Sequence, residues 1–135
     1  MTAAEGVSNQ GDILTTDPTL EEVNRVRRGH RFYPTAAELA AIPRFYETED
    51  TETAEKVLHL HYFGGSCDWW LTEYDPESHL GFGYACLGDS EMAEWGYVDL
   101  KELEPVSVGL VVIERDLHWA PRSVAATELP GQAVC

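Results

Sequence analysis

Two histidines separated by one residue form the part of this sequence that most resembles a chemical site. His59 and His61 lie in a segment whose apolar residues alternate, which predicts a β-strand. Side chains two positions apart project from the same face of a strand, so the two imidazoles could bind one metal ion. Glu73 or Asp75, on the next predicted strand, would supply a third ligand. The alternative is that both histidines are polar residues on the outer face of a sheet.

Carboxylates spaced two residues apart are a second group with chemical potential. Such pairs can serve acid–base or magnesium-dependent reactions, which usually also need a cation or base at a fixed spacing. The sequence has few lysines and no nuclease-like Asp…Glu-x-Lys run. The alternative is a structural ion pair in which Arg115 contacts Glu73 or Glu102. The carboxylates concerned are Glu73, Asp75, Glu114 and Asp116.

Aromatic residues in the predicted strands indicate either a core or a partner interface. Alternation places Trp69 and Trp70 on opposite faces, so one of them belongs to the core and the other is exposed or covered by a helix. Trp and Tyr are common anchors of protein interfaces. The candidate binding residues of such an acidic, aromatic-bearing face are Trp70, Glu73, Asp75 and Trp95.

A basic cluster ends the first predicted helix. Residues 17–19 (Asp-Pro-Thr) form a helix start, apolar residues recur at helical spacing, and Gly29 predicts the stop. One interpretation is that cations favoured at a helix C-terminus dock on the acidic body. The other is contact with nucleic acid or an acidic partner, with Arg27 and Arg28 as candidates. The cluster consists of Arg25, Arg27, Arg28, His30 and Arg31.

The remaining motifs exclude several classes of site. There is no Gly-x-Gly-x-x-Gly loop for phosphates and no Gly-x-Ser-x-Gly elbow, and we expect no cofactor. Three cysteines without a Cys-x-x-Cys pair argue against a disulfide scaffold or a zinc knuckle. We expect free thiols at Cys67, Cys86 and Cys135.

The elements that must position these residues are helices followed by strands. Thr35 and Glu38 form a capping box for a second, short helix. Gly81 and Gly83 predict close packing or a bulge in one strand. This order predicts an α+β fold, with N-terminal helices packed on a mainly antiparallel sheet of about four to five strands. The predicted strands span residues 57–63, 69–74, 80–87, 94–98 and 106–113, and a single helical turn begins at Asp99.

Charge and hydropathy divide the chain into regions. We expect a flexible N-terminal segment over 1–16, one α+β domain over 17–122 and a flexible tail over 123–135. The formal net charge of the 135 residues is −15, and residues 47–116 hold 17 acidic residues against three basic ones, a net of −14. No stretch reaches the ~20 apolar residues that cross a bilayer, and no secretory signal precedes the domain. We therefore expect a cytoplasmic protein.

Several short segments, taken in order, resemble one family. Residues 42–49 (IPRFYETE) are similar to its "lPxLYxtE", 61–63 (HYF) to "KFF", and 69–75 (WWLTEYD) to "WtWYaTEfDg". Residues 82–83 (FG) are similar to "fFGlv", 94–104 (EWGYVDLKELE) to "ElGYFSLsELE", and 113–119 (IERDLHW) to "iERDLyf". The family is the domain of unknown function 2958, met in plasmids, conjugative elements and phages, and the resemblance covers about residues 36–122. It implies an accessory protein of a phage or mobile element and supplies no catalytic residues.

These observations favour a binding protein over an enzyme. The leading hypothesis is a non-enzymatic module that binds a host or element-encoded protein through its acidic face, with mimicry of DNA as a variant. The alternative is a metal-dependent hydrolase that uses His59, His61 and a carboxylate from Glu73 or Asp75. Like charges repel, so we expect no direct nucleic-acid binding except through the basic N-terminal helix, and no binding to a membrane.

Overall fold

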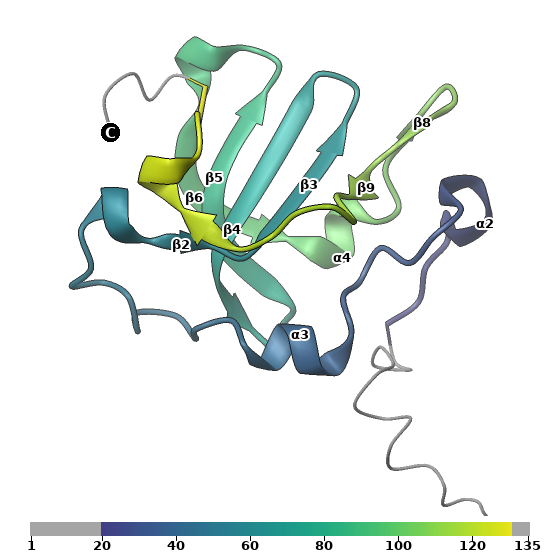
Figure 1. Cartoon of the computed structure of the whole chain (residues 1–135). Coiled ribbons are helices and arrows are strands. Elements are labelled where there is room, and N and C mark those ends of the chain that lie inside the picture. The colour runs from purple at the N-terminus through teal and green to yellow at the C-terminus, as the bar shows by residue number, and fades with distance from the viewer. Residues whose placement is uncertain (1–19, 131–135) are drawn as a thin grey trace, which may run out of the picture.

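One five-stranded antiparallel sheet forms the centre of the molecule (Figure 1). The computed structural model describes residues 20–130. The strands lie in the order β6-β5-β4-β3-β9, and all pairs are antiparallel. With short helices preceding the sheet, this arrangement confirms the predicted α+β fold. The strands are β3 (Leu60–Gly64), β4 (Cys67–Asp75), β5 (Leu80–Leu87), β6 (Glu94–Asp99) and β9 (Glu114–Arg115).

Shorter elements surround this sheet. Thr35 and Glu38 form the predicted capping box at the start of a helix: the Thr35 hydroxyl accepts from the Glu38 N–H, and the Glu38 carboxylate accepts from the Thr35 N–H. No helix within residues 20–130 is long and apolar enough to cross a membrane. The helices are α2 (Arg25–Arg28), α3 (Ala36–Ala40) and α4 (Leu100–Leu103), with 3₁₀ turns η1 (Thr53–Glu55), η2 (Ser90–Met92) and η3 (Val124–Ala126). Two small antiparallel sheets pair β2 (Val57–Leu58) with β10 (Arg122–Ser123), and β7 (Ser107–Val108) with β8 (Val111–Val112).

Two predicted elements differ from the structure. The sequence predicts a helix from residue 17 to Gly29, but in the described part of this range only α2 is helical. The predicted start at residues 17–19 lies outside the described residues. Val23 and Val26 are 68% and 93% exposed, so they form no buried stripe, whereas Gly29 ends the helix with a φ of 88° as predicted. The single strand expected over 106–113 is instead the β7–β8 hairpin, because Gly109 reverses the chain with a φ of 60°.

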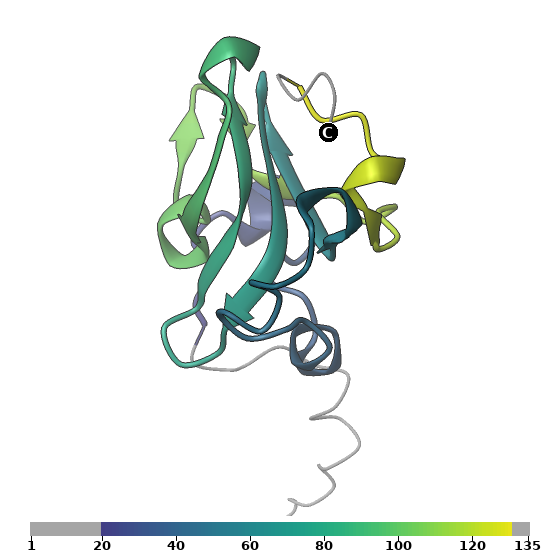
Figure 2. The same cartoon turned by 90° about the vertical axis from the view of Figure 1, so that its left-hand side faces the viewer.

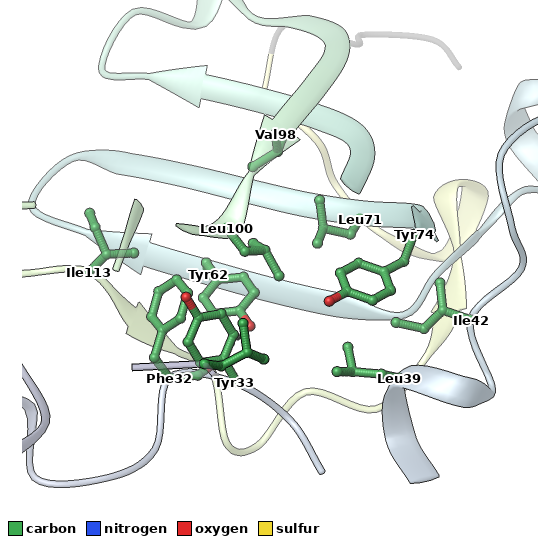
Figure 3. Close-up of a cluster of buried hydrophobic side chains, with 11 residues drawn as sticks. Phe32, Tyr33, Leu39, Ile42, Tyr62, Leu71, Tyr74, Val98, Leu100 and Ile113 are labelled. Carbon is green, nitrogen blue, oxygen red and sulfur yellow. Dashed lines mark hydrogen bonds between the residues drawn. The ribbon is translucent and has the colours of Figure 1, made fainter. Parts of the chain in front are cut away.

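The first face of the sheet is covered by the N-terminal part of the chain. Residues 32–42 and α4 lie over it and bury a cluster of aromatic and aliphatic side chains (Figure 3). Tyr62 from β3 lies at its centre, and its hydroxyl donates to the Phe32 carbonyl oxygen at 2.9 Å. The buried members of this cluster are Leu20, Phe32, Tyr33, Leu39, Ile42, Tyr62, Leu71, Tyr74, Val98, Leu100 and Ile113.

The second face is covered by β2 and by the C-terminal segment, drawn in yellow on one side of the sheet in Figure 2. Val124 and Leu129 are buried there, and the Tyr84 hydroxyl donates to the Pro130 carbonyl oxygen at 2.6 Å. Residues of the 123–130 segment therefore pack against the sheet, beyond the domain boundary expected at residue 122. Buried members of this second cluster are Leu58, Trp70, Tyr84, Cys86, Val124 and Leu129.

A buried ion pair attaches α2 to the body of the protein. Arg28 Nη1 lies 3.1 Å from Glu104 Oε2, and both side chains are almost completely buried. Glu104 also accepts from the backbone N–H groups of Val23 and Asn24, each at 2.9 Å. Arg28 Nε donates to the Ile113 carbonyl oxygen at 2.7 Å. The expected pair of Arg115 with Glu73 or Glu102 is wrong: Arg115 donates to the Arg31 carbonyl oxygen, and the buried Arg–carboxylate pair is that of Arg28 and Glu104.

A β-bulge in β4 changes the faces to which its later residues point. The register with β5 shifts between Leu71 and Glu73, which leaves Thr72 as the extra residue. Leu71 and Tyr74 consequently both belong to the first-face cluster although they are three positions apart. Glu73, the neighbour of Tyr74 in the strand, therefore points to the opposite face of the sheet, which is the face of Trp70. Opposite the bulge, a Cβ atom at Gly83 would lie 1.8 Å from the Trp70 carbonyl oxygen, so only glycine fits at this position.

We predict that Gly83→Ala destabilises the protein by roughly 3 kcal/mol or more, because the added methyl group collides with backbone that cannot move aside without breaking the β4–β5 pairing. Gly96→Ala on β6 is the matched control, because its Cβ would meet nothing within 4 Å. Urea unfolding followed by tryptophan fluorescence measures both variants. Equal midpoints for the two variants would contradict the proposed role of Gly83.

Candidate functional site

Glu73 is a buried carboxylate that holds a loop against the sheet. Its Oε1 accepts from the Tyr46 N–H and its Oε2 from the Thr48 N–H, each at 3.0 Å, and Oε2 also accepts from the Thr48 hydroxyl. The Tyr74 N–H donates to the Pro43 carbonyl oxygen at 2.9 Å and ties down the start of the same segment. These bonds supply partners for backbone N–H groups that belong to no regular element. Residues 43–48 are therefore positioned by β4.

Five aromatic side chains surround a hollow beside this carboxylate. Phe45 and Tyr46 come from the loop, whereas the other three project from the neighbouring strands β5 and β6. The Tyr46 and Tyr97 hydroxyls lie 3.3 Å apart, so the loop and the strand meet directly. The hollow measures about 320 Å³, and we call it the aromatic pocket. Its lining consists of Phe45, Tyr46, Glu49, Thr53, Lys56, Glu73, Phe82, Trp95 and Tyr97.

The polar groups of the aromatic pocket are arranged around Thr48. Lys56 Nζ donates to the Thr48 carbonyl oxygen at 2.5 Å and to its hydroxyl at 3.3 Å. The Tyr97 pKa is raised, first by its hydrogen bond with Tyr46 and then by the neighbouring charges and burial, so this phenol stays neutral. Glu49 and Thr53 belong to the acidic segment 47–55 and close one side of the hollow. The pocket thus presents ring surfaces together with two carboxylates and one ammonium group.

Tyr46 has a strained backbone at this site. Its φ is 71°, in the left-handed region that non-glycine residues seldom adopt. Its N–H bond to Glu73 helps to hold this conformation. Strain of this kind persists where the surrounding structure over-determines it and is frequent at binding sites. The conformation leaves the Tyr46 side chain 66% exposed at the mouth of the aromatic pocket.

His61 forms a second polar cluster, on the face covered by the C-terminal segment. Its Nδ1 lies 2.9 Å from Asp116 Oδ2 and its Nε2 lies 2.8 Å from Asp68 Oδ1. Both nitrogens can donate at once only in the cationic imidazolium form. The His61 ring stacks on the Trp70 ring, with centroids 5.0 Å apart and an angle of 11° between the ring planes. The Trp119 ring packs beside it, with its centroid 5.4 Å from that of His61. This cluster links β3, β4 and the segment after β9.

The predicted metal ligands are not brought together. The expected strand over 57–63 is interrupted at His59. Leu58 therefore packs in the second-face cluster, whereas Tyr62 packs in the first-face cluster. The prediction of one uninterrupted alternation over 57–63 is wrong. Burial lowers the pKa of His59, which lines a different hollow from His61. Glu73 lines the aromatic pocket. In residues 20–130, no three His, Cys, Asp or Glu side chains are close enough to hold a metal ion.

The other binding residues expected from the sequence lie in different parts of the structure. Trp70 is only 6% exposed and packs in the second-face cluster, whereas Trp95 lines the aromatic pocket. Asp75 accepts from the Ser78 hydroxyl at 2.7 Å and from the Glu77 N–H at 3.2 Å, which closes the β4–β5 turn. The hydrogen bonds from Ser78 and Glu77 lower the Asp75 pKa.

The two basic candidates differ in exposure. The Arg28 guanidinium is buried against Glu104 and is not available to a nucleic acid. Arg27 is exposed and donates to the Gly109 carbonyl oxygen at 3.3 Å. Cys67 and Cys86 are free thiols as expected, and Cys135 lies outside the described residues.

Sequence reasoning missed most of the aromatic pocket. Phe45, Tyr46, Phe82 and Tyr97 were not candidates, although all four lie in segments that carry the family resemblance (42–49, 82–83 and 94–104). The family resemblance of these segments is the feature of the sequence that could have identified the four aromatic residues. Nothing in the sequence indicates that Asp68 contacts His61, because this contact depends on the register between β3 and β4.

We predict that Glu73→Gln destabilises the protein by about 1–3 kcal/mol, because an amide NH₂ group would face one of the two backbone N–H donors at this site. Glu77→Gln, in the exposed β4–β5 turn, is the matched control and should change the free energy of unfolding by less than about 0.5 kcal/mol. Urea unfolding at neutral pH gives both values. A loss for Glu73→Gln no larger than that of the control would show that the loop does not depend on this carboxylate.

A second prediction concerns pH. Burial raises the Asp116 pKa, but hydrogen bonds from His61 and from the His118 N–H outweigh it and hold the pKa below the ordinary value of 3.8. A carboxyl whose pKa is lowered by folding stabilises the fold above its ordinary pKa, and this contribution is lost as the pH falls through the lower pKa of the folded state. Asp116→Asn should therefore cost about 1–2 kcal/mol at pH 7 and progressively less under acid.

Urea unfolding of this variant at neutral pH and at about pH 2.5 measures the difference. Asp50→Asn, at an exposed position in the acidic segment, is the control and should match the wild-type protein at both pH values. A deficit for Asp116→Asn that is equal at both pH values would contradict the assignment to the ionised carboxylate.

Comparison with known proteins agrees with the resemblance seen in the sequence. Residues 34–127 match the family model described as "Protein of unknown function (DUF2958)". No curated protein and no solved structure matches the chain. The matched region includes every residue that lines the aromatic pocket and the whole five-stranded sheet. The chain belongs to the DUF2958 family of proteins of unknown function.

Proposed function

We propose that this protein is a non-enzymatic binding module that attaches to a basic protein through the aromatic pocket and the acidic segment 47–55. The observation that carries the proposal is the joint position of these two features on one surface: Glu49 and Thr53 of the acidic segment line the aromatic pocket. An open hollow with apolar walls and a few directed polar groups is typical of a binding site.

The acidic segment provides charge that the described part of the protein leaves unpaired. Its five carboxylates are all exposed, and none forms an ion pair with a residue in the 20–130 range. A surface of one sign attracts a partner of the opposite sign and accelerates its association. The carboxylates are those of Glu47, Glu49, Asp50, Glu52 and Glu55.

The aromatic pocket provides anchors of the kind that dominate interface energetics. Tyr46 and Tyr97 are 66% and 57% exposed, and Trp95 is half-buried beside them. Tyr and Trp residues contribute a large share of binding energy when a partner excludes water from them. Glu73 is engaged with the loop backbone, which supports a role in positioning rather than in acid–base chemistry.

We also propose a setting for this binding module. We place the protein among the accessory proteins of phages or mobile elements, acting in the host cytoplasm on a host or element-encoded protein. The exposed carboxylates would repel nucleic acid, and they would suit a cleft that normally binds DNA. A DNA-binding protein is therefore one kind of basic partner consistent with this surface.

The test is capture from host lysate with matched charge variants. The first variant carries Gln at Glu49, Glu52 and Glu55; the control carries Gln at the exposed Glu77, Glu91 and Glu102. We expect the wild-type protein and the control to retain the same discrete basic protein at moderate salt, and the first variant to lose it.

Retention of no protein by the wild-type chain would contradict the proposed function. Equal retention by both variants would also contradict it, because both remove the same number of charges and only one removes them beside the aromatic pocket.

A further inference from the structure

Within residues 20–130, the charge of Glu73 has no direct counter-ion. Its side chain is buried, the residue being 6% exposed, and within residues 20–130 its carboxylate accepts from N–H and O–H donors of Tyr46 and Thr48. It forms no ion pair with a residue between 20 and 130. By contrast, the buried carboxylate of Glu104 has the Arg28 guanidinium at 3.1 Å. A buried charge with hydrogen bonds but no counter-ion favours the approach of a cation.

The ammonium group of Lys56 does not remove this charge from the aromatic pocket. It bonds to the carbonyl and hydroxyl oxygens of Thr48, on the loop side of Glu73. The lining holds two carboxylates, Glu49 and Glu73, against this one cation. The pocket therefore keeps a negative balance, which disfavours a phosphate or carboxylate ligand.

The rings are arranged as walls. Tyr97 is steeply inclined to both Phe45 and Phe82, with ring centroids 5.4 Å apart in each case and interplanar angles of 63° and 70°. Phe82 and Trp95 are closer to parallel, at 18°. All of these rings line the same hollow, and the face of an aromatic ring attracts a cation. Aromatic cages bind ammonium groups in this way.

The size of the hollow limits what can enter. A volume of about 320 Å³ is at the lower end of the range for ligand pockets, ~300–1,000 Å³, so it suits one long side chain better than a cofactor. Lys and Arg combine an apolar stem with a charged head, which matches ring walls beside a carboxylate.

We propose that the aromatic pocket receives one alkyl cation, the side chain of a Lys or Arg residue of the basic partner. This inference rests on the proposed function and names the group that the pocket recognises. The stem packs between the rings, and the charged head lies near Glu73 and Glu49. A neutral side chain of the same length would leave the pocket's negative charge uncompensated.

The test uses small probes that share one alkyl stem. The protein is titrated with n-butylammonium chloride, n-butylguanidinium chloride and n-butanol at constant ionic strength, and the NMR signal of the Trp95 indole N–H is followed. We expect saturable shifts with either or both cations, at concentrations at least about tenfold lower than for butanol. The two cations distinguish Lys from Arg as the preferred residue.

Two variants connect the shifts to the aromatic pocket. Tyr97→Leu keeps an apolar wall but removes a ring face, and it should weaken binding of the cations at least about threefold. Phe63→Leu is the matched control, an exposed aromatic residue on β3 outside the pocket, and it should bind the cations as the wild-type protein does. Equal binding of butanol and the cations, the absence of saturable shifts, or an unchanged Tyr97→Leu variant would overturn the inference.

Failure of this inference and failure of the proposed function give different results. Capture of a basic partner that depends on the acidic segment, without preference for the alkyl cations, would overturn the inference and leave the binding module intact. Selective cation binding without capture of any partner would support the pocket's specificity and contradict the proposed function.

Discussion

The extra residue in β4 is the constraint on which the site depends. This strand is the middle one of the five and is covered on both faces. If β4 alternated regularly through Thr72, with no bulge, Glu73 would point into the first-face cluster and Tyr74 away from it. The bulge has a cost, because the Thr72 hydroxyl is buried and has no hydrogen-bond partner among the described residues. The bonds that Glu73 makes to Tyr46 and Thr48 offset that cost and place the loop.

Buried carboxylates hold irregular segments in place at several positions in the described part of the protein. Glu73 accepts from two backbone N–H groups of one loop, and Glu104 and Glu22 each do the same for the N-terminal segment. Backbone donors outside helices and strands need such acceptors when they lie against a core. Part of the acidic composition therefore stabilises the fold. Glu104 and Glu22 both have Arg28 nearby, and the absence of a similar ion pair at Glu73 in the described part distinguishes the aromatic pocket.

The acidic residues behind the net charge of −15 therefore include two groups with different roles. Interior carboxylates accept hydrogen bonds and belong to the architecture. The exposed carboxylates of segment 47–55 contribute to no such contact network, with the exception of Glu47, which accepts from the Arg44 N–H. Exposed charge of one sign beside accessible rings is the combination expected of a surface that meets a basic partner.

Local chemistry alone determined the order of the elements. Alternation gave the strands β3 to β6, the residues at 64–66 and 75–78 gave the turns, and Thr35 with Glu38 gave the cap of α3, because each of these depends on near neighbours. Local reasoning did not find the bulge or the strand break at His59, which reverse the faces of the residues that follow. It also could not pair Glu73 with Tyr46, or His61 with Asp68 and Asp116. Those contacts join residues from different elements, so only the register of the sheet and the packing of the loop decided them.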